Sequence, residues 1–470
     1  MEFATTTPPG AGLLAAATGS GDRPLFPPTF IWGSATSAYQ IEGGVGQDGR
    51  GESIWDRFSS VEGNIADGTT GAVACDHYNR WRDDVSMMRS LSMSGYRFSI
   101  AWPRVIPEGT GTVNPSGLDF YDRLVDGLLE AGIEPFPTLY HWDLPQTLED
   151  RGGWPSRIAP EAFADYVEVV VSRLADRIGT WTTVNEPFVV ANHGYLTGEH
   201  APGRCSLAEG LAASHHVLLA HGMALERIRA IAPNAAAGIT LNFTPAYRTS
   251  DAPAAFDRFQ IIDDLENWWY INPISGRGYP QRTADRLGWD QREVRDGDLD
   301  LIAQPIDFLG VNFYTRQLIG AVEGEGRARR RRATAMGWEI HPESLGWLLR
   351  TLHERFQMPA YFVTENGAAM SDTVRCDGRI ADLDRIDYMR DHLAQLAAVI
   401  AEGVPVNGYF AWSLLDNFEW AHGYRYRFGI VEISPQTLDR IPKQSALWYA
   451  AVARTGRLDN VVEVSTERLR

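Results

Sequence analysis

The sequence predicts an α/β fold, a single-domain (β/α)8 barrel with long loops between its strands and helices. Two observations support this fold class. Eight short runs rich in β-branched and aromatic residues recur along the chain, and longer segments of helical character lie between them. An alternation of this kind is typical of a closed parallel barrel, in which the long βα loops build the active site.

The eight strands are expected, in chain order, at Ile31–Gln40, Gly95–Trp102, Pro135–Trp142, Trp181–Glu186, Ala237–Phe243, Phe308–Tyr314, Tyr361–Glu365 and Gly408–Leu414. Between the third and fourth strands, apolar residues recur at the spacing of one helix face, at Phe163, Tyr166, Val167, Val170, Val171 and Leu174. No linker or composition shift follows Leu25, so residues 25–470 are expected to form one domain. Residues 1–24, rich in small residues, Thr, Pro and Gly, are expected to be a mobile tail.

Composition narrows the class of protein further. The 470 residues are 44% hydrophobic and 22% charged, as in an ordinary globular protein, and no apolar run approaches the ~18 residues of a membrane span. The net charge of −17 argues against nucleic acid or an anionic membrane as the main partner. Three widely spaced cysteines, Cys75, Cys205 and Cys376, imply neither a zinc site nor a disulfide framework. With an N-terminus that lacks basic residues, these thiols favour a cytoplasmic location.

Two predicted strands end in a glutamate. Glu186 closes the fourth strand, within Thr183–Pro187, and Glu365 closes the seventh, within Val363–Gly367. Charged residues at the end of a buried strand are costly unless a site uses them. Two opposed carboxylates are what glycoside hydrolysis needs, one as acid/base and one as nucleophile or activator of water. From spacing alone, the alternative is that each glutamate caps a helix or pairs with an arginine.

Seven motifs then follow one another along the chain: FIWGSATSAYQIEG at 30–43, YRFSIAWPR at 96–104, YHWDLP at 140–145, TVNEP at 183–187, NFYT at 312–315, TENG at 364–367 and WSLLDNFEW at 412–420. In this order and over about residues 25–456, they closely resemble the β-glucosidases of glycoside hydrolase family 1.

The resemblance implies a catalytic machinery of four residues. Glu186 is expected to be the general acid/base and Glu365 the nucleophile of a retaining mechanism, with the two carboxyl groups ~5–5.5 Å apart. Arg97 is expected to hold the nucleophile, and Tyr314 to hydrogen-bond to it. From the residues alone, Arg97 would equally suit a structural ion pair, and Tyr314 an aromatic at the barrel rim.

The resemblance also implies a sugar-binding set. The polar members, which match hydroxyl-binding positions of the family, are Gln40, His141, Asn185, Asn312 and Glu419. The aromatic members are Trp412 as a stacking floor, Trp420, Trp142 and Phe428 around the ring, and Trp338 at the aglycone side. Outside this motif context, His141, Trp412, Phe428 and Trp338 would each be read as ordinary packing residues.

Glu419 indicates which of the possible substrates the site accepts. A carboxylate at this position favours free sugar hydroxyls over a phosphate group, so an unphosphorylated β-glucoside is the expected substrate. The alternatives are a 6-phospho-β-glycosidase and a catalytically silent sugar-binding barrel. Neither a metal nor an organic cofactor is expected, and the partners are small β-glucosides and oligosaccharides. The basic run Arg327–Arg332 is read as a solvated loop, or alternatively as a flank of the site entrance or a contact for another subunit.

Overall fold

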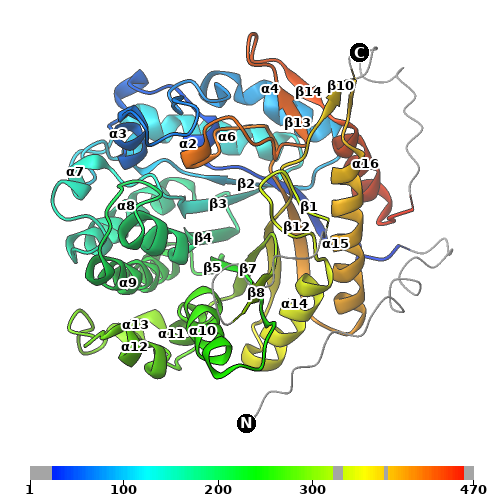
Figure 1. Ribbon diagram of the computed structural model, residues 1–470. Helices are drawn as coiled ribbons and strands as arrows, with labels where there is room; N and C mark the ends of the chain where they lie inside the picture. Colours follow the sequence, from blue (N-terminus) through cyan, green and yellow to red (C-terminus); the bar gives the residue numbers. More distant parts are fainter. Residues whose placement is uncertain (1–23, 321–331, 375–378, 460–470) are drawn as a thin grey trace.

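The computed structural model describes residues 24–320, 332–374 and 379–459. Eight parallel strands close into a TIM barrel, as predicted, in the order β1-β12-β9-β7-β5-β4-β3-β2 (Figure 1). The barrel strands are β1 Ile31–Ala35, β2 Gly95–Ser99, β3 Glu134–Tyr140, β4 Thr180–Asn185, β5 Ala236–Phe243, β7 Phe308–Phe313, β9 Tyr361–Asn366 and β12 Val406–Trp412. Apart from Pro24, the predicted N-terminal tail lies outside the described residues.

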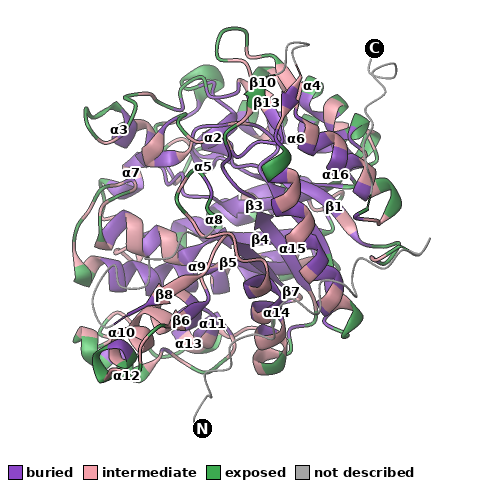
Figure 2. Cartoon of the chain, turned by 45° about the vertical axis from the view of Figure 1, so that its right-hand side comes forward, coloured by how far each residue is buried: buried purple, intermediate pink, exposed green. Residues whose placement is uncertain are grey.

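Helices surround the barrel and pack their apolar faces on it. The long ones are α4 His77–Ser90, α6 Pro115–Glu130, α8 Ile158–Leu174, α9 Leu207–Ile231, α14 Glu343–Phe356, α15 Leu383–Ala401 and α16 Gln444–Thr455. The apolar face predicted between the third and fourth strands lies on α8, where all six of its residues are buried. Figure 2 shows the strands as almost wholly buried and the helices as buried on one side only, which is the amphipathic pattern of a barrel's outer ring.

A layer of phenylalanine rings fills part of the barrel interior. Its members are Phe136, Phe308, Phe362 and Phe410, one from each of four strands. Neighbouring ring centroids lie 5.0–5.4 Å apart, most of them edge to face or tilted, as aromatic rings prefer. We call these four residues the phenylalanine layer.

The eight strands are confirmed, but the first is shorter than predicted. β1 ends at Ala35, and Gln40 lies on a one-turn helix, α2 Ala38–Ile41, rather than on the strand. All four residues of α2 are buried, so the apolar run continues past the strand end and hides the change of conformation. The second strand likewise ends at Ser99, because the helix α5 Trp102–Val105 begins with a proline in its first turn. The other strand ends lie within two residues of the prediction.

The remaining length lies in the connections, as expected for this fold. The short helices are α3 Ile54–Ser60, α7 Gln146–Glu149, α10 Pro253–Asp263, α11 Ile271–Ile274, α12 Gln281–Leu287 and α13 Asp298–Ile302, with the 3-10 turns Gln47–Gly49 and Trp420–His422 and the π-helical segments Val189–Leu196 and Asp264–Trp268. Three two-stranded sheets pair β6 Ala246–Arg248 with β8 Gln317–Ile319, β10 Thr373–Val374 with β11 Ile380–Ala381, and β13 Val431–Ile433 with β14 Arg440–Pro442.

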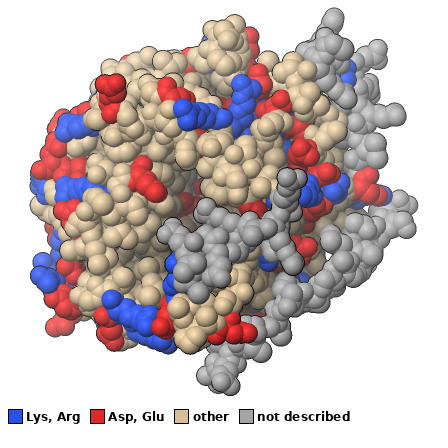
Figure 3. Space-filling view, in the orientation of Figure 1, with Lys and Arg blue, Asp and Glu red and all other residues tan. Residues whose placement is uncertain are grey.

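Acidic and basic side chains alternate on the surface drawn in Figure 3. Many of them pair: Arg177, for example, binds Asp122, Asp126 and Asp176. Among the described helices, none combines the length and apolar character that crossing a bilayer requires. Residues 327–331 of the basic run lie outside the described residues, and Arg332 lies 3.5 Å from Asp391.

Candidate functional site

The predicted site residues meet at the C-terminal ends of the barrel strands. Arg97, Asn185, Asn312, Glu365 and Trp412 lie on the strands β2, β4, β7, β9 and β12. His141, Glu186 and Tyr314 each follow directly after a strand. Hydrogen bonds join all of these residues except Trp412 in one network, and ring contacts connect that network to Trp412, Trp420 and Trp142.

Glu365 is held through both of its carboxyl oxygens. Arg97 Nη1 donates to Oε1 at 2.6 Å, and the Tyr314 hydroxyl donates to Oε2 at 2.6 Å. The Glu365 residue is 3% exposed, so this ion pair is shielded from solvent. A buried cation and a phenol hydroxyl both favour a negatively charged carboxylate here.

The strand that carries Glu365 is irregular at this point. Val311 on β7 pairs with Val363, but the next residue, Asn312, pairs with Glu365. The register shift leaves Thr364 as an extra residue on β9, and bulges of this kind re-aim side chains beside active sites. Two consecutive side chains therefore reach the barrel interior, since Thr364 binds Asn312 while Glu365 binds Arg97.

Glu186 lies in a different environment. Its Oε1 accepts a hydrogen bond from Asn312 Nδ2 at 2.7 Å. Burial, followed by the charge of nearby Glu365, raises the pKa of Glu186 to about 8, although Asn312 and Arg97 act in the opposite direction. A carboxyl group with this pKa carries a proton at neutral pH, which is what a general acid needs.

Asn185 connects the two glutamates. Its Oδ1 accepts from Arg97 Nη2 at 2.7 Å and from Asn312 Nδ2 at 3.1 Å. Because Oδ1 must be the acceptor, Nδ2 donates to His141 Nε2, 3.1 Å away. This assigns the His141 proton to Nδ1, which is buried without a partner in the described part of the chain. Burial and the charge of Arg97 lower the pKa of His141, so the ring is neutral.

Gln40 is oriented by its own chain segment and by the loop after β12. Ser37 Oγ donates to Gln40 Oε1 at 2.6 Å, while Gln40 Nε2 donates to Asn417 Oδ1 at 3.1 Å and to the Phe418 carbonyl at 2.9 Å. Both N–H groups are thus engaged, and Oε1 keeps an acceptor site for a ligand hydroxyl.

Aromatic rings cover the opposite side of the site. Trp412 and Trp420 each lie with ring centroids 6.0 Å from His141 and nearly parallel to it. Trp142 lies 4.5 Å from Trp420 and donates its indole N–H to the Asn185 carbonyl at 2.9 Å. These rings present apolar faces next to the polar groups, as a site for a sugar requires.

A second aromatic group lies beside Tyr314. Trp338, which is partly exposed, has its ring centroid 5.5 Å from that of Tyr314 and 6.1 Å from that of Phe428. Phe428 is buried in the same cluster as Trp412 and the phenylalanine layer. Trp338 therefore lies next to the pair formed by Tyr314 and Glu365, at the edge of the polar network.

Glu419 carries a second unusual carboxyl group. Burial and the charge of Glu365 raise the pKa of Glu419 to about 8. Its Oε2 atom is inaccessible to solvent and has no hydrogen-bond partner among the described residues. A buried polar atom without a partner is rare in a folded protein and needs an explanation.

Three of these residues adopt backbone angles that side chains rarely tolerate. The φ angle is +80° at Trp142, +50° at Glu186 and +47° at Trp420. Such angles cost of order 1 kcal/mol or more each, and they tend to cluster at functional sites. These turns direct the three side chains across the barrel mouth. None of the three residues is a glycine, so the sequence did not indicate their positive φ angles.

Some contributors were not predicted from the sequence. Thr364 orients Asn312, and Asn417 orients Gln40, as described above. Asp143, inside the YHWDLP motif, is completely buried with neither carboxyl oxygen hydrogen-bonded in the described structure, and burial raises its pKa to about 8. All three residues lie inside motifs whose other members were predicted to be site residues. That position was the only sequence signal that could have found them.

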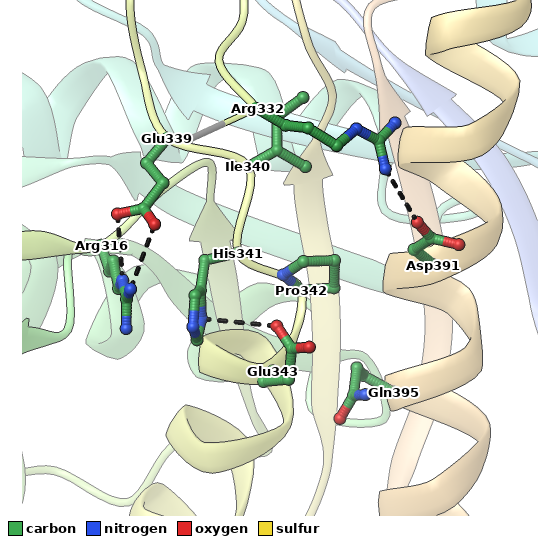
Figure 4. A pocket seen from close by; sticks show the side chains of 9 residues that line it. All are labelled: Arg316, Arg332, Glu339, Ile340, His341, Pro342, Glu343, Asp391 and Gln395. Atoms are coloured by element: carbon green, nitrogen blue, oxygen red, sulfur yellow. Dashed lines mark hydrogen bonds and ion pairs between the residues drawn. The ribbon is translucent and has the colours of Figure 1, made fainter. Parts of the chain in front are cut away.

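A separate cavity of about 420 Å³ lies between Glu339–Glu343, Arg316 and helix α15. Figure 4 shows the side chains that line it: Arg316 forms an ion pair with Glu339, Arg332 forms one with Asp391, and His341 lies 3.5 Å from Glu343. None of the predicted site residues lines this cavity.

One group of carboxylates has the spacing of a cation site. Asp372, Asp416 and Glu432 bring oxygens within 4.8 Å of one another. Lys443 Nζ, however, lies 2.7 Å from Asp372 and 2.9 Å from Asp416, so an ammonium group already neutralises them. The arrangement is that of a buried ion-pair network.

Comparisons with known proteins agree with this geometry. The sequence profile of glycosyl hydrolase family 1 matches residues 23–457. β-Glucosidase A of Acetivibrio thermocellus is 45% identical over 439 residues, covering 91% of this chain and 98% of the relative. A bifunctional β-D-glucosidase/β-D-fucosidase of Bifidobacterium breve is 42% identical over 455 residues, covering 90% of this chain and 97% of the relative.

The fold comparison leads to the same family. A solved β-glucosidase from Thermotoga maritima, in complex with glucoimidazole, matches with a TM-score of 0.88 at 43% sequence identity. The match covers 92% of this chain and 99% of that chain. The chain belongs to glycosyl hydrolase family 1.

Proposed function

We propose that the protein is a retaining β-glucosidase. It releases terminal β-D-glucose from cellobiose, short β-glucans and aryl or alkyl β-glucosides. One observation carries the proposal: two buried glutamates at the barrel mouth lie in opposite environments on a single hydrogen-bonded network. Glu365 accepts from a cation and a phenol, while Glu186 has a pKa raised to about 8.

The difference between the two glutamates supports a double displacement. In the first step Glu365 attacks the anomeric carbon, the glycosidic C–O bond breaks, and Glu186 gives its proton to the leaving oxygen. The aglycone leaves as an alcohol, and the glucosyl group is bound to Glu365 as an ester. In the second step Glu186, now a carboxylate, takes a proton from water as the water attacks the same carbon and Glu365 is released.

The electrostatics also support the change of role at Glu186. The charge of Glu365 is one cause of its raised pKa. Once Glu365 is esterified, that charge is gone, so the pKa of Glu186 falls and the group becomes a base. The carboxyl separation of ~5–5.5 Å stays a prediction of this mechanism.

Two orphaned atoms support a role for this site in sugar binding. We assign His141 Nδ1 as a donor to a glucose hydroxyl and Glu419 Oε2 as the partner of another. Gln40 Oε1 and the free N–H of Asn185 complete the hydroxyl contacts, and Trp412 and Trp420 offer apolar faces to the C–H side of the ring. Trp338 is assigned to the aglycone side.

Specificity rests on Gln40 and Glu419. A few hydrogen bonds distinguish the orientation of the 4-hydroxyl, so some β-galactosidase and β-fucosidase activity is expected. The relative from Bifidobacterium breve is described as both a glucosidase and a fucosidase. Alcohols compete with water for the covalent intermediate, so transglycosylation is also expected.

The alternative substrate is a 6-phospho-β-glycoside. Because the pKa of Glu419 is raised to about 8, it is largely neutral at pH 7, so charge repulsion alone is a weaker barrier to phosphate than the sequence suggested. The barrier that remains is the cost of burying a dianion beside Glu419 and Glu365. The small-molecule partners are thus unphosphorylated β-glucosides, and the free thiols of Cys75 and Cys205 support a cytoplasmic location.

A rate comparison tests the proposal. Purified protein is assayed between pH 6 and 7, with a chelator, on nitrophenyl β-glucoside, β-galactoside, β-glucoside 6-phosphate and cellobiose. Fast turnover of the glucoside and of cellobiose is expected, with slower turnover of the galactoside. Turnover of the phosphorylated substrate alone would refute the specificity, and turnover of none would favour a sugar-binding barrel without catalysis.

A further inference from the structure

The hydrogen bond to Glu186 comes from a side chain with two unlike ends. Asn312 Nδ2 donates to Glu186 Oε1 at 2.7 Å. An asparagine amide carries donors on its nitrogen and an acceptor on its oxygen, and the two ends have nearly the same shape. Rotated by half a turn, the same amide would turn its oxygen toward Glu186 and repel a carboxylate. Whatever fixes the rotation therefore controls the charge state of Glu186.

Thr364 fixes this rotation. Its Oγ1 donates to Asn312 Oδ1 at 2.7 Å, and both residues are completely buried. The second N–H of Asn312 points to Asn185 Oδ1, which is already held as an acceptor by Arg97. In the rotated state the Asn312 oxygen would face Asn185 Oδ1 and, once Glu186 is ionised, the Glu186 carboxylate as well, and the hydroxyl of Thr364 would lose its acceptor, so the observed state is favoured.

A second threonine orients the hydroxyl of Thr364. Thr240 Oγ1, on β5, donates to Thr364 Oγ1 at 3.4 Å, which leaves the Thr364 proton for Asn312. Gly310 on β7 makes room for the two hydroxyls, because a Cβ there would lie 2.3 Å from Thr240 Oγ1 and 3.0 Å from the Thr364 side chain. The chain of hydrogen-bond donors thus runs from Thr240 on β5 to Thr364 on β9, then to Asn312 on β7, and from there to Glu186.

We propose that Thr364 is a positioning residue for the reaction: it locks the Asn312 amide with its N–H toward Glu186 and so sets the pH at which Glu186 loses its catalytic proton. The inference rests on the proposed function, since it takes Glu186 as the acid/base. The Thr364 hydroxyl acts on the reaction through Asn312, to which it donates.

Other charged and titratable groups also act on Glu186, from every side of the barrel mouth. They are Arg97 on β2, Tyr314 after β7, Glu365 on β9 and Glu419 after β12, while the neutral ring of His141 after β3 faces Asn185. A substitution of the Thr364 side chain removes none of these groups, and the Thr364 carbonyl, which accepts from Arg97 Nη1 at 3.3 Å, is present in every variant. A change in the pH profile of a Thr364 variant therefore reports the amide of Asn312.

The test compares the pH dependence of kcat/KM on an aryl β-glucoside among wild type, Thr364→Val, Thr364→Ala, Thr364→Ser and Thr240→Val. In the valine and alanine variants the basic limb moves to a pH higher by about 0.5 to 1, because a weakened hydrogen bond stabilises the charged form of Glu186 less. Thr364→Ser keeps the hydroxyl and the wild-type basic limb.

Thr240→Val is the matched control. It removes a buried hydroxyl that lies one step further from Asn312 and whose bond to Thr364 is long at 3.4 Å, and it leaves the Thr364 donor itself intact, so its basic limb shifts less than in the Thr364 variants. If the valine variant does not fold, the smaller alanine variant carries the test, and thermal melting separates loss of structure from a shifted profile. An unmoved basic limb in the valine and alanine variants, or an equal shift in the Thr364→Ser or Thr240→Val variant, would overturn the proposal. A wild type that is inactive on β-glucosides would instead refute the proposed function.

Discussion

Two layers of side chains fill the barrel, and the same strands supply both. The phenylalanine layer consists of Phe136, Phe308, Phe362 and Phe410. The layer at the barrel mouth follows two to five residues later on each of those strands, with His141, Asn312, Glu365 and Trp412. We call the second set, with its hydrogen-bonded neighbours, the polar layer.

The two layers differ in what they contribute. The phenylalanine layer is apolar, tightly packed and free of buried charge, which is the arrangement that stabilises a fold. The polar layer buries a charged pair, leaves atoms of His141 and Glu419 without partners among the residues that the structure describes, and places Glu186 at a φ of +50°. Buried charges and strained turns cost stability, so this layer is retained for chemistry and the layer beneath it compensates.

The largest effect is expected from removing Glu365, the central group of the polar layer. Glu365→Ala should lower kcat on an aryl β-glucoside by roughly 10⁴- to 10⁶-fold, because a nucleophile has no substitute nearby. Azide, which fits the vacated space, should restore turnover and give the α-glucosyl azide. Unchanged kcat would remove Glu365 from the mechanism.

The next largest effect distinguishes the role of Glu186 from that of Glu365. Glu186→Gln removes the proton that assists the leaving oxygen, so cellobiose hydrolysis should fall by roughly 10²- to 10⁴-fold. The glycosylation step should fall far less on a dinitrophenyl glucoside, whose phenolate leaves without a proton. Pre-steady-state rates on both substrates check this. Equal losses would argue against Glu186 as the acid.

The third prediction concerns the phenylalanine layer. Phe136→Ala should lower the free energy of unfolding by about 3–5 kcal/mol, because the ring is 1% exposed and touches three others. The folded fraction should keep kcat within a few-fold of wild type. Phe256→Ala is the control, since Phe256 is 40% exposed and should cost less than about 0.5 kcal/mol. Denaturant titration with parallel assays measures both, and a large loss of kcat in the folded Phe136 variant would contradict the division between the layers.

The smallest effect needs no substitution. Glu186 must be protonated to act as an acid, and its pKa is raised to about 8. The kcat/KM of wild type should therefore hold through neutral pH and fall about tenfold for each further pH unit above about 8. A basic limb near the ordinary carboxyl range would show that burial and Glu365 do not act on Glu186 as described.

The sequence predicted the fold because strands and helices leave a periodic signal. All eight strands and the apolar face of α8 followed from residue type and spacing. The end of β1 did not, because the buried run continues into α2 and apolar character alone does not distinguish strand from helix there.

The strand ends singled out Glu186 and Glu365 as an opposed pair, and the motifs supplied their roles and the rest of the candidate site. The motifs marked Glu186 and Glu365, but they gave no orientation for Asn312 and no sign of the bulge at Thr364. These features depend on contacts between β4, β7 and β9, which are far apart in sequence. The left-handed turn at Glu186 was equally hidden, since nothing in its residue type announces a positive φ.

The proposed mechanism depends most on Glu365 forming a covalent bond to the sugar. Trapping that bond tests the mechanism directly. A 2-deoxy-2-fluoro-β-glucoside with a good leaving group forms the ester quickly and loses it slowly, because fluorine destabilises the positive charge of both transition states. Mass spectrometry of the treated protein should show one added fluoroglucosyl group, and peptide mapping should place it on Glu365. A label on Glu186 or on any other residue, or turnover without any trapped species, would contradict the account.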